Sequence, residues 1–544
     1  MPLHVALEEN LRFLVIEVQK QVARSRAYLS DPTGRSSRSI AGRDDYIDNL
    51  KTIIQRRCFS LAAESSEEGG TPLDVLKAVD IIAVNLEHIA DYCENIIAQT
   101  KYLRTLDPLE RQNFAPFFEE VLSGLDQICD AVLDLDLKVA TRICRVEPET
   151  DRLYKKRLGA LLKEIQSGGN ASDLVTLIFI YRYLERMGDA LLNIGEAVMS
   201  ACLGERVKIG QFEALEDSLA SAGAVPADVS LHTMAETRSG CKIDRVDMSQ
   251  TPIAEKAVIF KEGSAKKVEA ERDGIEAWHK IAPGLAPRIH AFNHDHDHSS
   301  ILLEYLDGWT FDKYLLNGTE EELDSALSRL CKTLDDIWSK TREDGPVAAN
   351  FVQQMKDRMN EVYSVHPEFR SESSSIGSLE IASFDRLIDR ASEFESGLSA
   401  PFSVFIHGDF NVDNIIFDRA SDDLHFIDLH RSRRTDYLQD VSVFLVSNFR
   451  LRVPRDNTRK RIKKVTLAFY EFAKGFAERQ GDKTFQLRLA LGIARSMATS
   501  SRFILDSHFA RTLYLRSRYM LELIGHADPA HPEKFEIPTD ALVD

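Results

Sequence analysis

The run HGDFNVDN, from His407 to Asn414, gathers carboxylate and amide side chains directly after an apolar stretch. Asp409 and Asn414 lie five residues apart, and Asp428 follows fourteen residues later in the run HFIDLHR. Phosphoryl transfer needs a proton acceptor beside the attacking hydroxyl, and oxygen ligands that hold Mg²⁺ against nucleotide phosphates. The spacing therefore predicts Asp409 as the base, and Asn414 and Asp428 as magnesium ligands.

Residues suited to holding the nucleotide lie upstream of this run. Lys261 ends the strand-like run KAVIFK, and Glu271 lies in the helical run that follows it. A strand lysine paired with a helix glutamate positions the α- and β-phosphates in kinases. The run ILLEYLDG at 301–308 is suited to the segment that joins two lobes, and its backbone at Glu304 and Leu306 is expected to hydrogen-bond adenine. These predictions require ATP and Mg²⁺ as cofactors.

This half of the chain, roughly 231–530, resembles the aminoglycoside phosphotransferase and choline kinase superfamily. The motif H-G-D-x-x-x-x-N of that superfamily is intact, its later I-D pair is Ile427 with Asp428, and the aspartate that braces its catalytic loop corresponds to Asp440. The resemblance implies a phosphotransferase with an alcohol group as acceptor. The small lobe is less similar, because Gly240 alone would serve the loop that covers the phosphates.

Each of these residues also has a purely structural explanation. Asp409 and Asn414 are typical turn residues, Asp440 could cap a helix, and Glu269 competes with Glu271 for the same role. A second hypothesis is therefore a nucleotide-sensing regulatory protein without turnover, which the glycine-poor loop favours and the complete catalytic set disfavours. A protein kinase is the weakest alternative, because no A-P-E-like segment follows the catalytic run to close an activation loop.

The acceptor of such a reaction stays open at the level of sequence. In the superfamily it depends on the helical lobe, here 310–400 and 450–530, where no recognisable motif occurs. An acidic groove would suit amines such as choline or aminoglycosides. The many acidic residues near 319–336 permit such a groove, and a solvated helix explains them equally well.

A duplicated acidic motif lies in the first 205 residues. LEHIADYCENI from Leu86 and LERMGDALLNI from Leu184 both carry E-x-x-x-D-x-x-x-N, at an offset of 98 residues. Four-residue steps place these side chains near one face of a helix, and carboxylates on facing helices hold metals in bundles. The alternative is a pair of solvated acidic stripes balanced by nearby Arg and Lys residues. The candidate metal ligands are Glu87, Asp91, Glu185 and Asp189.

The spacing of apolar residues predicts six helices in the same region. They are expected near 3–29, 44–66, 72–101, 107–135, 137–168 and 171–203. Two three-helix repeats, each with the acidic motif on its last helix, resemble the PhoU family of phosphate-regulatory proteins. The resemblance implies a bundle that binds iron, zinc or a similar ion, and a partner in phosphate transport or signalling.

The expected fold is multidomain, with an all-α PhoU-like double three-helix bundle followed by an α+β bilobal protein-kinase-like fold. The predicted limits are 1–205 for the bundle, 206–230 for a linker, 231–306 for the kinase-like N-lobe and 307–544 for the helical C-lobe. The linker prediction rests on a stretch that is rich in Ala, Ser and acidic residues. In this arrangement the helical domain would regulate the phosphotransferase in response to phosphate or metal.

The bulk composition limits the class of protein further. The 544 residues are 44% hydrophobic and 28% charged, with a formal net charge of −18, which disfavours non-specific nucleic-acid binding. No apolar run is long enough to span a bilayer and no signal peptide is recognisable. Seven scattered cysteines without a C-x-x-C pair favour a reducing compartment. We therefore expect a cytoplasmic protein that binds no nucleic acid and does not insert into a membrane.

Overall fold

The computed structural model describes most of the chain. The described residues are 3–32, 44–64, 71–204, 207–221, 230–236, 242–247, 257–294, 298–370, 372–377, 379–451 and 456–543. The chain divides into two compact units, 1–262 and 263–544. This division falls within strand β3 (Ala257–Ser264), and the predicted domain limits remain predictions.

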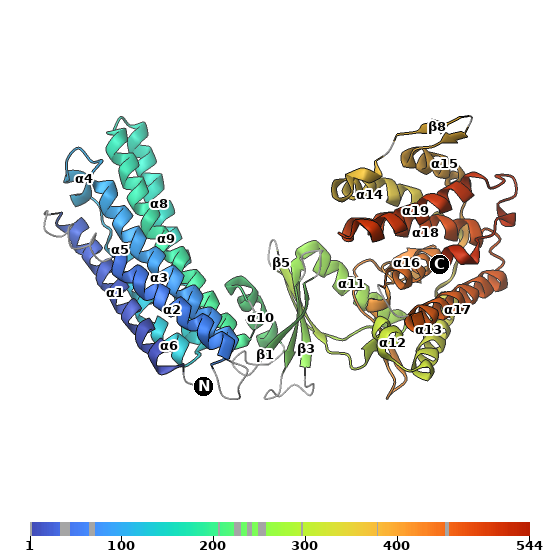
Figure 1. The fold of residues 1–544 in the computed structure, drawn as a ribbon, viewed down its shortest axis with the longest axis horizontal. Helices are drawn as coiled ribbons and strands as arrows, with labels where there is room; N and C mark the ends of the chain where they lie inside the picture. Colours follow the sequence, from blue (N-terminus) through green and yellow to red (C-terminus); the bar gives the residue numbers. More distant parts are fainter. Residues whose placement is uncertain are drawn as a thin grey trace. The chain divides into compact units, whose positions relative to one another are not determined.

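The first unit is a helical bundle followed by strands (Figure 1). Its helices are α1 (Val5–Ser30), α2 (Asp44–Glu64), α3 (Leu73–Thr100), α4 (Asp107–Glu110), α5 (Ala115–Asp126), α6 (Ile128–Leu133), α7 (Leu137–Cys144), α8 (Val146–Gln166), α9 (Ala171–Leu203) and α10 (Ile209–Ser221). Strands β1 (Ser230–Glu236), β2 (Lys242–Asp247) and β3 pair antiparallel in that order. The two helices that carry the acidic motifs, α3 and α9, pack extensively against each other.

Two predicted helices of this unit are each divided into shorter ones. The predicted helix at 107–135 forms α4, α5 and α6, and the one at 137–168 forms α7 and α8. Pro116 is the second residue of α5, and Pro148 is the third residue of α8. A proline has no N–H to donate to the carbonyl four residues earlier, so the preceding helix cannot continue through it. The other four predicted helices correspond to α1, α2, α3 and α9.

Helix α10 lies within the range predicted as a linker. Phe212, Leu215 and Leu219 are buried along one face of this helix, at the spacing of an amphipathic helix. The backbone N–H of Ile209 donates to Glu196 Oε1 on α9 at 3.0 Å, which ties the start of α10 to the bundle. The small and acidic residues around these three apolar positions concealed the helix in the sequence.

The second unit combines helices with short antiparallel strands (Figure 1). Its helices are α11 (Ala265–Ile281), α12 (Phe311–Asn317), α13 (Glu320–Thr341), α14 (Phe351–Val365), α15 (Phe384–Ser396), α16 (Leu438–Arg450), α17 (Asp456–Gln480), α18 (Phe485–Ser500) and α19 (Ser507–Gly525). Short 3₁₀ turns are η3 (Pro367–Phe369), η4 (Val412–Asn414), η5 (Ser501–Phe503), η6 (Pro532–Lys534) and η7 (Thr539–Leu542).

The strands of the second unit form small sheets that deliver loops to one region. They are β4 (Ile289–His294), β5 (His298–Glu304), β6 (Trp309–Thr310), β7 (Glu343–Val347), β8 (Ser374–Ile376), β9 (Leu379–Ile381), β10 (Ala400–Ile406), β11 (Ile415–Asp418), β12 (Asp423–Phe426) and β13 (Arg433–Thr435). β4 pairs with β5 and β8 with β9, and two three-stranded sheets have the orders β13-β10-β7 and β12-β11-β6. The predicted all-α and α+β architectures are confirmed.

Helix α11 is anchored to the sheets of the second unit by one buried tryptophan. The ring of Trp278 lies edge-on to those of Phe405 and Phe426, with centroid distances of 5.1 and 5.5 Å. Its indole Nε1 donates to Ser432 Oγ at 2.8 Å, so the polar atom of this buried ring is also satisfied.

In the part of the chain that the structure describes, no helix is both long and apolar enough to cross a membrane.

Candidate active site

The loop between β10 and β11 carries Asp409 on a backbone that hydrogen bonds hold at two points. The carboxylate of Asp440, on α16, accepts from the backbone N–H groups of His407 and Gly408, each at 2.8 Å. Asn414 Nδ2 donates to the backbone carbonyl of Asp409 at 2.9 Å. Asp440, for which the sequence predicts a bracing role, therefore holds the start of the loop, and Asn414 holds its middle.

A buried histidine connects this loop to the segment before Asp428. His407 Nε2 donates to the backbone carbonyl of Ile427 at 2.9 Å, and His407 Nδ1 accepts from the backbone N–H of Asp409 at 3.3 Å. Burial lowers the pKa of His407, which favours the neutral ring with one donor and one acceptor that these contacts require. The two predicted catalytic segments are thus fixed relative to each other.

Gly408 is required by both its conformation and its surroundings. Its φ is +86°, and a Cβ at this position would lie 2.3 Å from the carbonyl oxygen of Arg431. We expect Gly408→Ala to lower the free energy of unfolding by about 1–3 kcal/mol from the strained φ alone. Because the Arg431 carbonyl must also move, turnover should fall by about tenfold or more in a steady-state assay.

Gly284→Ala is the matched control for this prediction. Gly284 has a φ of +87°, and a Cβ there would meet nothing within 4 Å. This variant should therefore lose a similar amount of stability from strain and keep its turnover. Equal turnover in the two variants would show that the close approach at Gly408 has no role in the site.

The carboxylate of Asp409 is oriented by two neighbouring side chains. Asn411 Nδ2 donates to Asp409 Oδ1 at 2.9 Å, and an Arg431 guanidinium nitrogen lies 3.0 Å from Asp409 Oδ2. A carboxylate offers about four lone-pair positions, so it can still accept the proton of a hydroxyl. Sequence reasoning missed both partners. Asn411 lies in the motif run HGDFNVDN and could have been considered as a partner. No spacing rule shows which arginine of the basic run HRSRR points toward Asp409.

Asp428 lies in a group of potential metal ligands. Its φ of +62° is uncommon for a residue other than glycine and is typical of functional sites. His430 Nδ1 lies 3.2 Å from Asp428 Oδ1, and the backbone N–H of His430 donates to Glu271 Oε2 at 3.1 Å. One ligand atom from each of these three residues lies within 4.8 Å of the others, a combination found at no other place among the described residues.

The oxygen donors of this region fit Mg²⁺. Asn414 uses its amide nitrogen on the backbone of Asp409, so its Oδ1 remains as a donor oxygen. Asp428 supplies carboxylate oxygens, and Mg²⁺ prefers such hard ligands together with substrate phosphates. The assignment of Asn414 and Asp428 as magnesium ligands stays a prediction.

Helix α11 brings Glu271 to this group through a close backbone contact. A Cβ at Gly274 would lie 2.2 Å from the carbonyl oxygen of Leu429, so no other residue fits there without a shift. Glu271 is buried at the ligand group, whereas Glu269 is more exposed and lies 3.2 Å from His294 Nδ1. The contacts therefore favour Glu271 over its rival for the role at the phosphates.

The predicted phosphate-binding lysine lies on strand β3. Lys261 is buried and is paired in register with Ile243 of β2. Its pairing with Glu271 stays a prediction. Gly240, the glycine expected in the phosphate-covering loop, lies outside the described residues.

The predicted adenine-binding segment follows β5. Glu304 is the last residue of that strand, and its carboxylate pairs with the guanidinium of Arg288 at 3.0 Å. Leu306 is half-buried in the irregular segment that follows. Because the Glu304 carboxylate is paired with Arg288, the backbone groups of this segment are the ones that can hydrogen-bond adenine. That contact also stays a prediction.

The acidic motifs of the first unit lie on α3 and α9, and the two repeats differ in their surroundings. In the first repeat, Lys51 Nζ of α2 lies 2.7 Å from Glu87 Oε1. In the second repeat, Glu185 is buried beside Arg182, and its Oε2 has no hydrogen-bond partner. Burial, together with the charge of Asp189, raises the pKa of Glu185. The other two predicted ligands are Asp91 on α3 and Asp189 on α9.

Two further acids of α8 face the second motif. Burial and the charges of Asp189 and Asp151 raise the pKa of Glu147, and burial raises the pKa of Asp189 itself. Burial is the main cause of these raised pKa values, and the charges of Arg182 and Arg186 oppose the rise at Glu185 and Asp189. A bound cation would offset the cost of burying these carboxylates. The second repeat is therefore the better candidate for a cation, although the predicted bundle metal stays a prediction.

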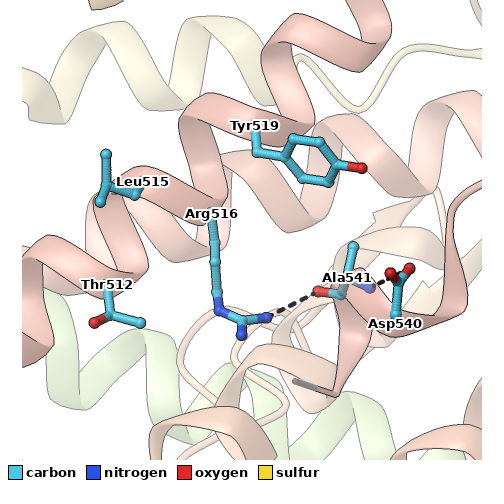
Figure 2. Close-up of a pocket in the computed structure, with 6 residues that line it drawn as sticks. All are labelled: Thr512, Leu515, Arg516, Tyr519, Asp540 and Ala541. Atoms are coloured by element: carbon cyan, nitrogen blue, oxygen red, sulfur yellow. Dashed lines mark hydrogen bonds between the residues drawn. The ribbon is translucent and has the colours of Figure 1, made fainter.

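Two cavities lie away from these residues. One, of about 540 Å³, lies between α3 and the end of α9 and includes Asn85 and Asn193 in its lining. The other, of about 390 Å³, lies between α19 and η7 in the second unit. Figure 2 shows its lining, in which Arg516 donates to the Ala541 carbonyl at 3.3 Å. Neither cavity is lined by a predicted site residue, so neither identifies the active site.

Comparison with known proteins gives matches for both units. Residues 16–100 and 116–198 match the family model described as PhoU domain, and residues 259–473 match the one described as phosphotransferase enzyme family. A phosphate-specific transport system accessory protein PhoU homolog from Zymomonas mobilis is 30% identical over 173 residues, which are 31% of this chain and 71% of the relative.

Two solved structures are also similar to parts of the chain. PhoU from Pseudomonas aeruginosa has 21% identity and a TM-score of 0.33, over 37% of this chain and 96% of its own. Aminoglycoside-3'-phosphotransferase of type VIII has 16% identity and a TM-score of 0.31, over 49% of this chain and 98% of its own.

The fold and the matching family models define a fusion of an all-α bundle of two repeats with an α+β phosphotransferase domain. This confirms the predicted combination of a PhoU domain and a small-molecule-kinase type of domain. The chain belongs to the PhoU family, since its first unit covers 71% of the Zymomonas mobilis relative at 30% identity.

Proposed function

We propose that this chain is an ATP- and Mg²⁺-dependent phosphotransferase that acts on a hydroxyl group of a small molecule. The match to the phosphotransferase enzyme family supports the reaction class. The observation that carries the proposal is the arrangement around Asp409, whose backbone is held through Asp440 and Asn414 and whose carboxylate is held by Asn411 and Arg431. A simple surface turn needs none of these contacts.

In the proposed reaction Asp409 accepts the proton of the attacking hydroxyl. Asn411 and Arg431 keep its carboxylate in one orientation, which saves the entropy of ordering it during the reaction. Asn414 and Asp428 would hold Mg²⁺, which when bound neutralises charge on the phosphate oxygens. The proposed nucleotide contacts are the Lys261 ammonium paired with Glu271, and the backbone groups of Glu304 and Leu306.

The helical unit would regulate this activity in response to phosphate or to a bound ion such as Fe or Zn. The name of the Zymomonas mobilis relative refers to phosphate-specific transport, which supports a phosphate-transport or signalling protein as the partner of the helical unit. The second repeat is the proposed ion site, because Glu185 is buried and its Oε2 has no hydrogen-bond partner, while its Oε1 pairs with Arg182. Its proposed ligands are Glu185 and Asp189.

Glu185→Gln should therefore weaken metal binding more than Glu87→Gln does. Loss of even an indirect partner of a metal costs about 10- to 100-fold in affinity, so loss of a direct ligand should cost at least about tenfold. Isothermal titration of the full chain with Zn²⁺ or Fe²⁺ measures both variants. Equal losses in the two variants would contradict the assignment to the second repeat.

We also propose a cytoplasmic location, without nucleic-acid binding or membrane insertion. The six cysteines within the described residues are free thiols, and burial raises the pKa of Cys58 and Cys144 to about 12. Such thiols are unreactive core groups, which suits a reducing compartment. The net charge of −18 supports the exclusion of nucleic acid.

The test of the proposed function is Mg²⁺-dependent ATP consumption by the full chain across a panel of hydroxyl compounds, with product formation confirmed by mass spectrometry. Turnover with an acceptor that Asp409→Asn abolishes would establish the phosphotransferase. ATP binding without transfer to any acceptor would favour the alternative of a nucleotide-sensing regulator. Repeating the assay with added inorganic phosphate or Zn²⁺ tests regulation in the same preparation.

A further inference from the structure

Arginine side chains from four elements gather around the proposed base. This arginine cluster, whose members interact electrostatically, is Arg358 on α14, Arg431 in the turn before β13, Arg433 at the start of β13, Arg495 on α18 and Arg502 on η5. Only Arg431 contacts Asp409 directly, at 3.0 Å. The charge of Asp409 also reaches the more distant members Arg495 and Arg502, so the cluster shares one electrostatic environment with the base.

Arg495 is the buried centre of this cluster. It is 8% exposed, its Nη2 donates to Ser442 Oγ at 3.3 Å, and its guanidinium carbon lies 5.5 Å from the ring centre of Phe351. Its Nε is buried without a hydrogen-bond partner, and no carboxylate of the described residues pairs with it. A buried cation is costly unless an anion compensates it. The folded chain therefore keeps an uncompensated positive charge near Asp409.

The other members add to this excess. Arg502 pairs with Glu361 of α14 at 3.0 Å, one turn of helix beyond Arg358. Within the described parts of the chain no carboxylate pairs with Arg358 or with Arg433. Burial and the charge of Arg358 lower the pKa of both Arg495 and Arg502 to about 10, so the guanidinium groups repel one another. Among the described residues, two members of the cluster form ion pairs, Arg431 with Asp409 and Arg502 with Glu361, and the charge of Arg433 also reaches the buried Asp440. Arg358 and Arg495 have no carboxylate partner there.

The acids near 319–336 do not supply a counter charge to this region. Glu320 and Asp324 lie on α13 and pair with Lys464 of α17 at 3.3 and 2.6 Å, and Asp335 pairs with Arg479. These contacts fit the solvated-helix explanation of the acidic run. An acidic acceptor groove built from this run is therefore not supported.

We propose that the acceptor is an anion, a small hydroxyl compound with a phosphate or carboxylate group that the arginine cluster binds. Planar guanidinium groups match the two oxygens of such a group, and the geometry leaves Asp409 beside the cluster for the hydroxyl. The inference rests on the proposed phosphotransferase function. Amines such as choline and aminoglycosides are disfavoured as acceptors, since the excess positive charge repels them.

The proposed phosphoryl transfer needs no co-reactant other than ATP. The acceptor hydroxyl oxygen forms a bond to the γ-phosphorus, and the bond between that phosphorus and the β,γ-bridging oxygen breaks. The hydroxyl proton passes to the Asp409 carboxylate, and ADP leaves with the electron pair of the broken bond. The anionic group of the acceptor takes no part in this chemistry and serves only for binding.

The first experiment compares acceptors that differ only in their charged group. Initial rates with ATP and Mg²⁺ are measured for glycerol against glycerol 3-phosphate and glucose against glucose 6-phosphate, with choline and kanamycin as cationic compounds. We expect kcat/KM to be about 100-fold higher for the phosphorylated member of a pair. A neutral or cationic compound as the best acceptor would overturn the inference while it supports the phosphotransferase.

The second experiment removes a member of the cluster. Arg358→Gln should raise KM for the anionic acceptor by about tenfold or more and leave KM for ATP unchanged, whereas Arg358→Lys should recover part of the loss. Arg479→Gln is the control, because Arg479 pairs with Asp335 on the outer surface. An equal effect of Arg479→Gln, or a changed KM for ATP alone, would contradict an acceptor-binding role.

A binding measurement separates failure of the inference from failure of the proposed function. The Asp409→Asn variant is mixed with a non-hydrolysable ATP analogue and Mg²⁺, and glycerol 3-phosphate is then added in increasing amounts. The resulting shift in the Tm of the protein is compared with the shift that chloride produces at equal ionic strength. We expect stabilisation that Arg358→Gln, introduced into the same background, reduces. If no acceptor is phosphorylated but this binding persists, the enzyme is refuted and the anion site stands. Equal Tm values in glycerol 3-phosphate and chloride would refute the anion site.

Discussion

Asp409→Asn is expected to lower kcat by about 10²- to 10⁴-fold, the usual contribution of a positioned general base. The amide keeps the size of the carboxylate, so the loop contacts through Asp440 and Asn414 should survive. The dissociation constant for ATP should therefore stay within about twofold, since the substitution removes an interaction made in the transition state. Steady-state kinetics together with nucleotide titration measure both quantities.

Asp423→Asn provides the control for this prediction. Asp423 is an exposed carboxylate at the start of β12, in the same hairpin that follows the catalytic loop. The same chemical change at Asp423 should leave kcat within about twofold of the unsubstituted value, because this side chain is solvated and has no proposed part in the reaction. Unchanged turnover in Asp409→Asn would remove Asp409 from the mechanism.

Arg488→Met is expected to produce the largest loss of stability in the second unit. Arg488 is 4% exposed and lies between Asp436 and Asp482, whose side chains are fully buried. Removing the cation leaves two buried carboxylates without compensation, which should cost about 3–5 kcal/mol in the free energy of unfolding. Tryptophan fluorescence in denaturant measures this change, since all three tryptophans of the chain lie in the second unit.

Lys464→Met is the matched control, because Lys464 also lies between two carboxylates. Its partners are Glu320 and Asp324, but its side chain is 48% exposed. Exposed ion pairs contribute at most about 1 kcal/mol, so the midpoint of unfolding should hardly change. A triple variant with Arg488, Asp436 and Asp482 all replaced by apolar residues should recover much of the loss, since no charge is then buried alone. Equal losses in Arg488→Met and Lys464→Met would contradict this account.

Candidate site residues can be proposed from the sequence where they lie in short runs, and their roles stay predictions. Asp409, Asn414 and Asp428 lie within twenty residues of one another, and the requirements of phosphoryl transfer identify them by type and spacing. The duplicated acidic motif was visible for the same reason. The combination of an all-α bundle with an α+β unit followed from the change in the spacing of apolar residues.

The arginine cluster could not be predicted, because its members are brought together by tertiary packing. Arg358 and Arg495 are 137 residues apart, and their approach depends on how α14 and α18 are turned toward each other. Arg358 alone has the pattern of an ordinary surface residue on an amphipathic helix, and Arg495 lies on α18, whose residues are almost all buried. The breaks before α5 and α8 were missed because apolar spacing continues through Pro116 and Pro148 although the hydrogen bonds do not.

The contact of Gly274 with Leu429 has a mechanical consequence. No side chain lies between the backbone of α11 and the segment that begins with Asp428, so nothing there can yield when the helix shifts. Any displacement of α11 must move Leu429 with it or separate the two, and Asp428 immediately precedes Leu429. Helix α11 is therefore mechanically coupled to Asp428, the proposed magnesium ligand. A displacement of α11 is expected to shift the backbone of the candidate site directly.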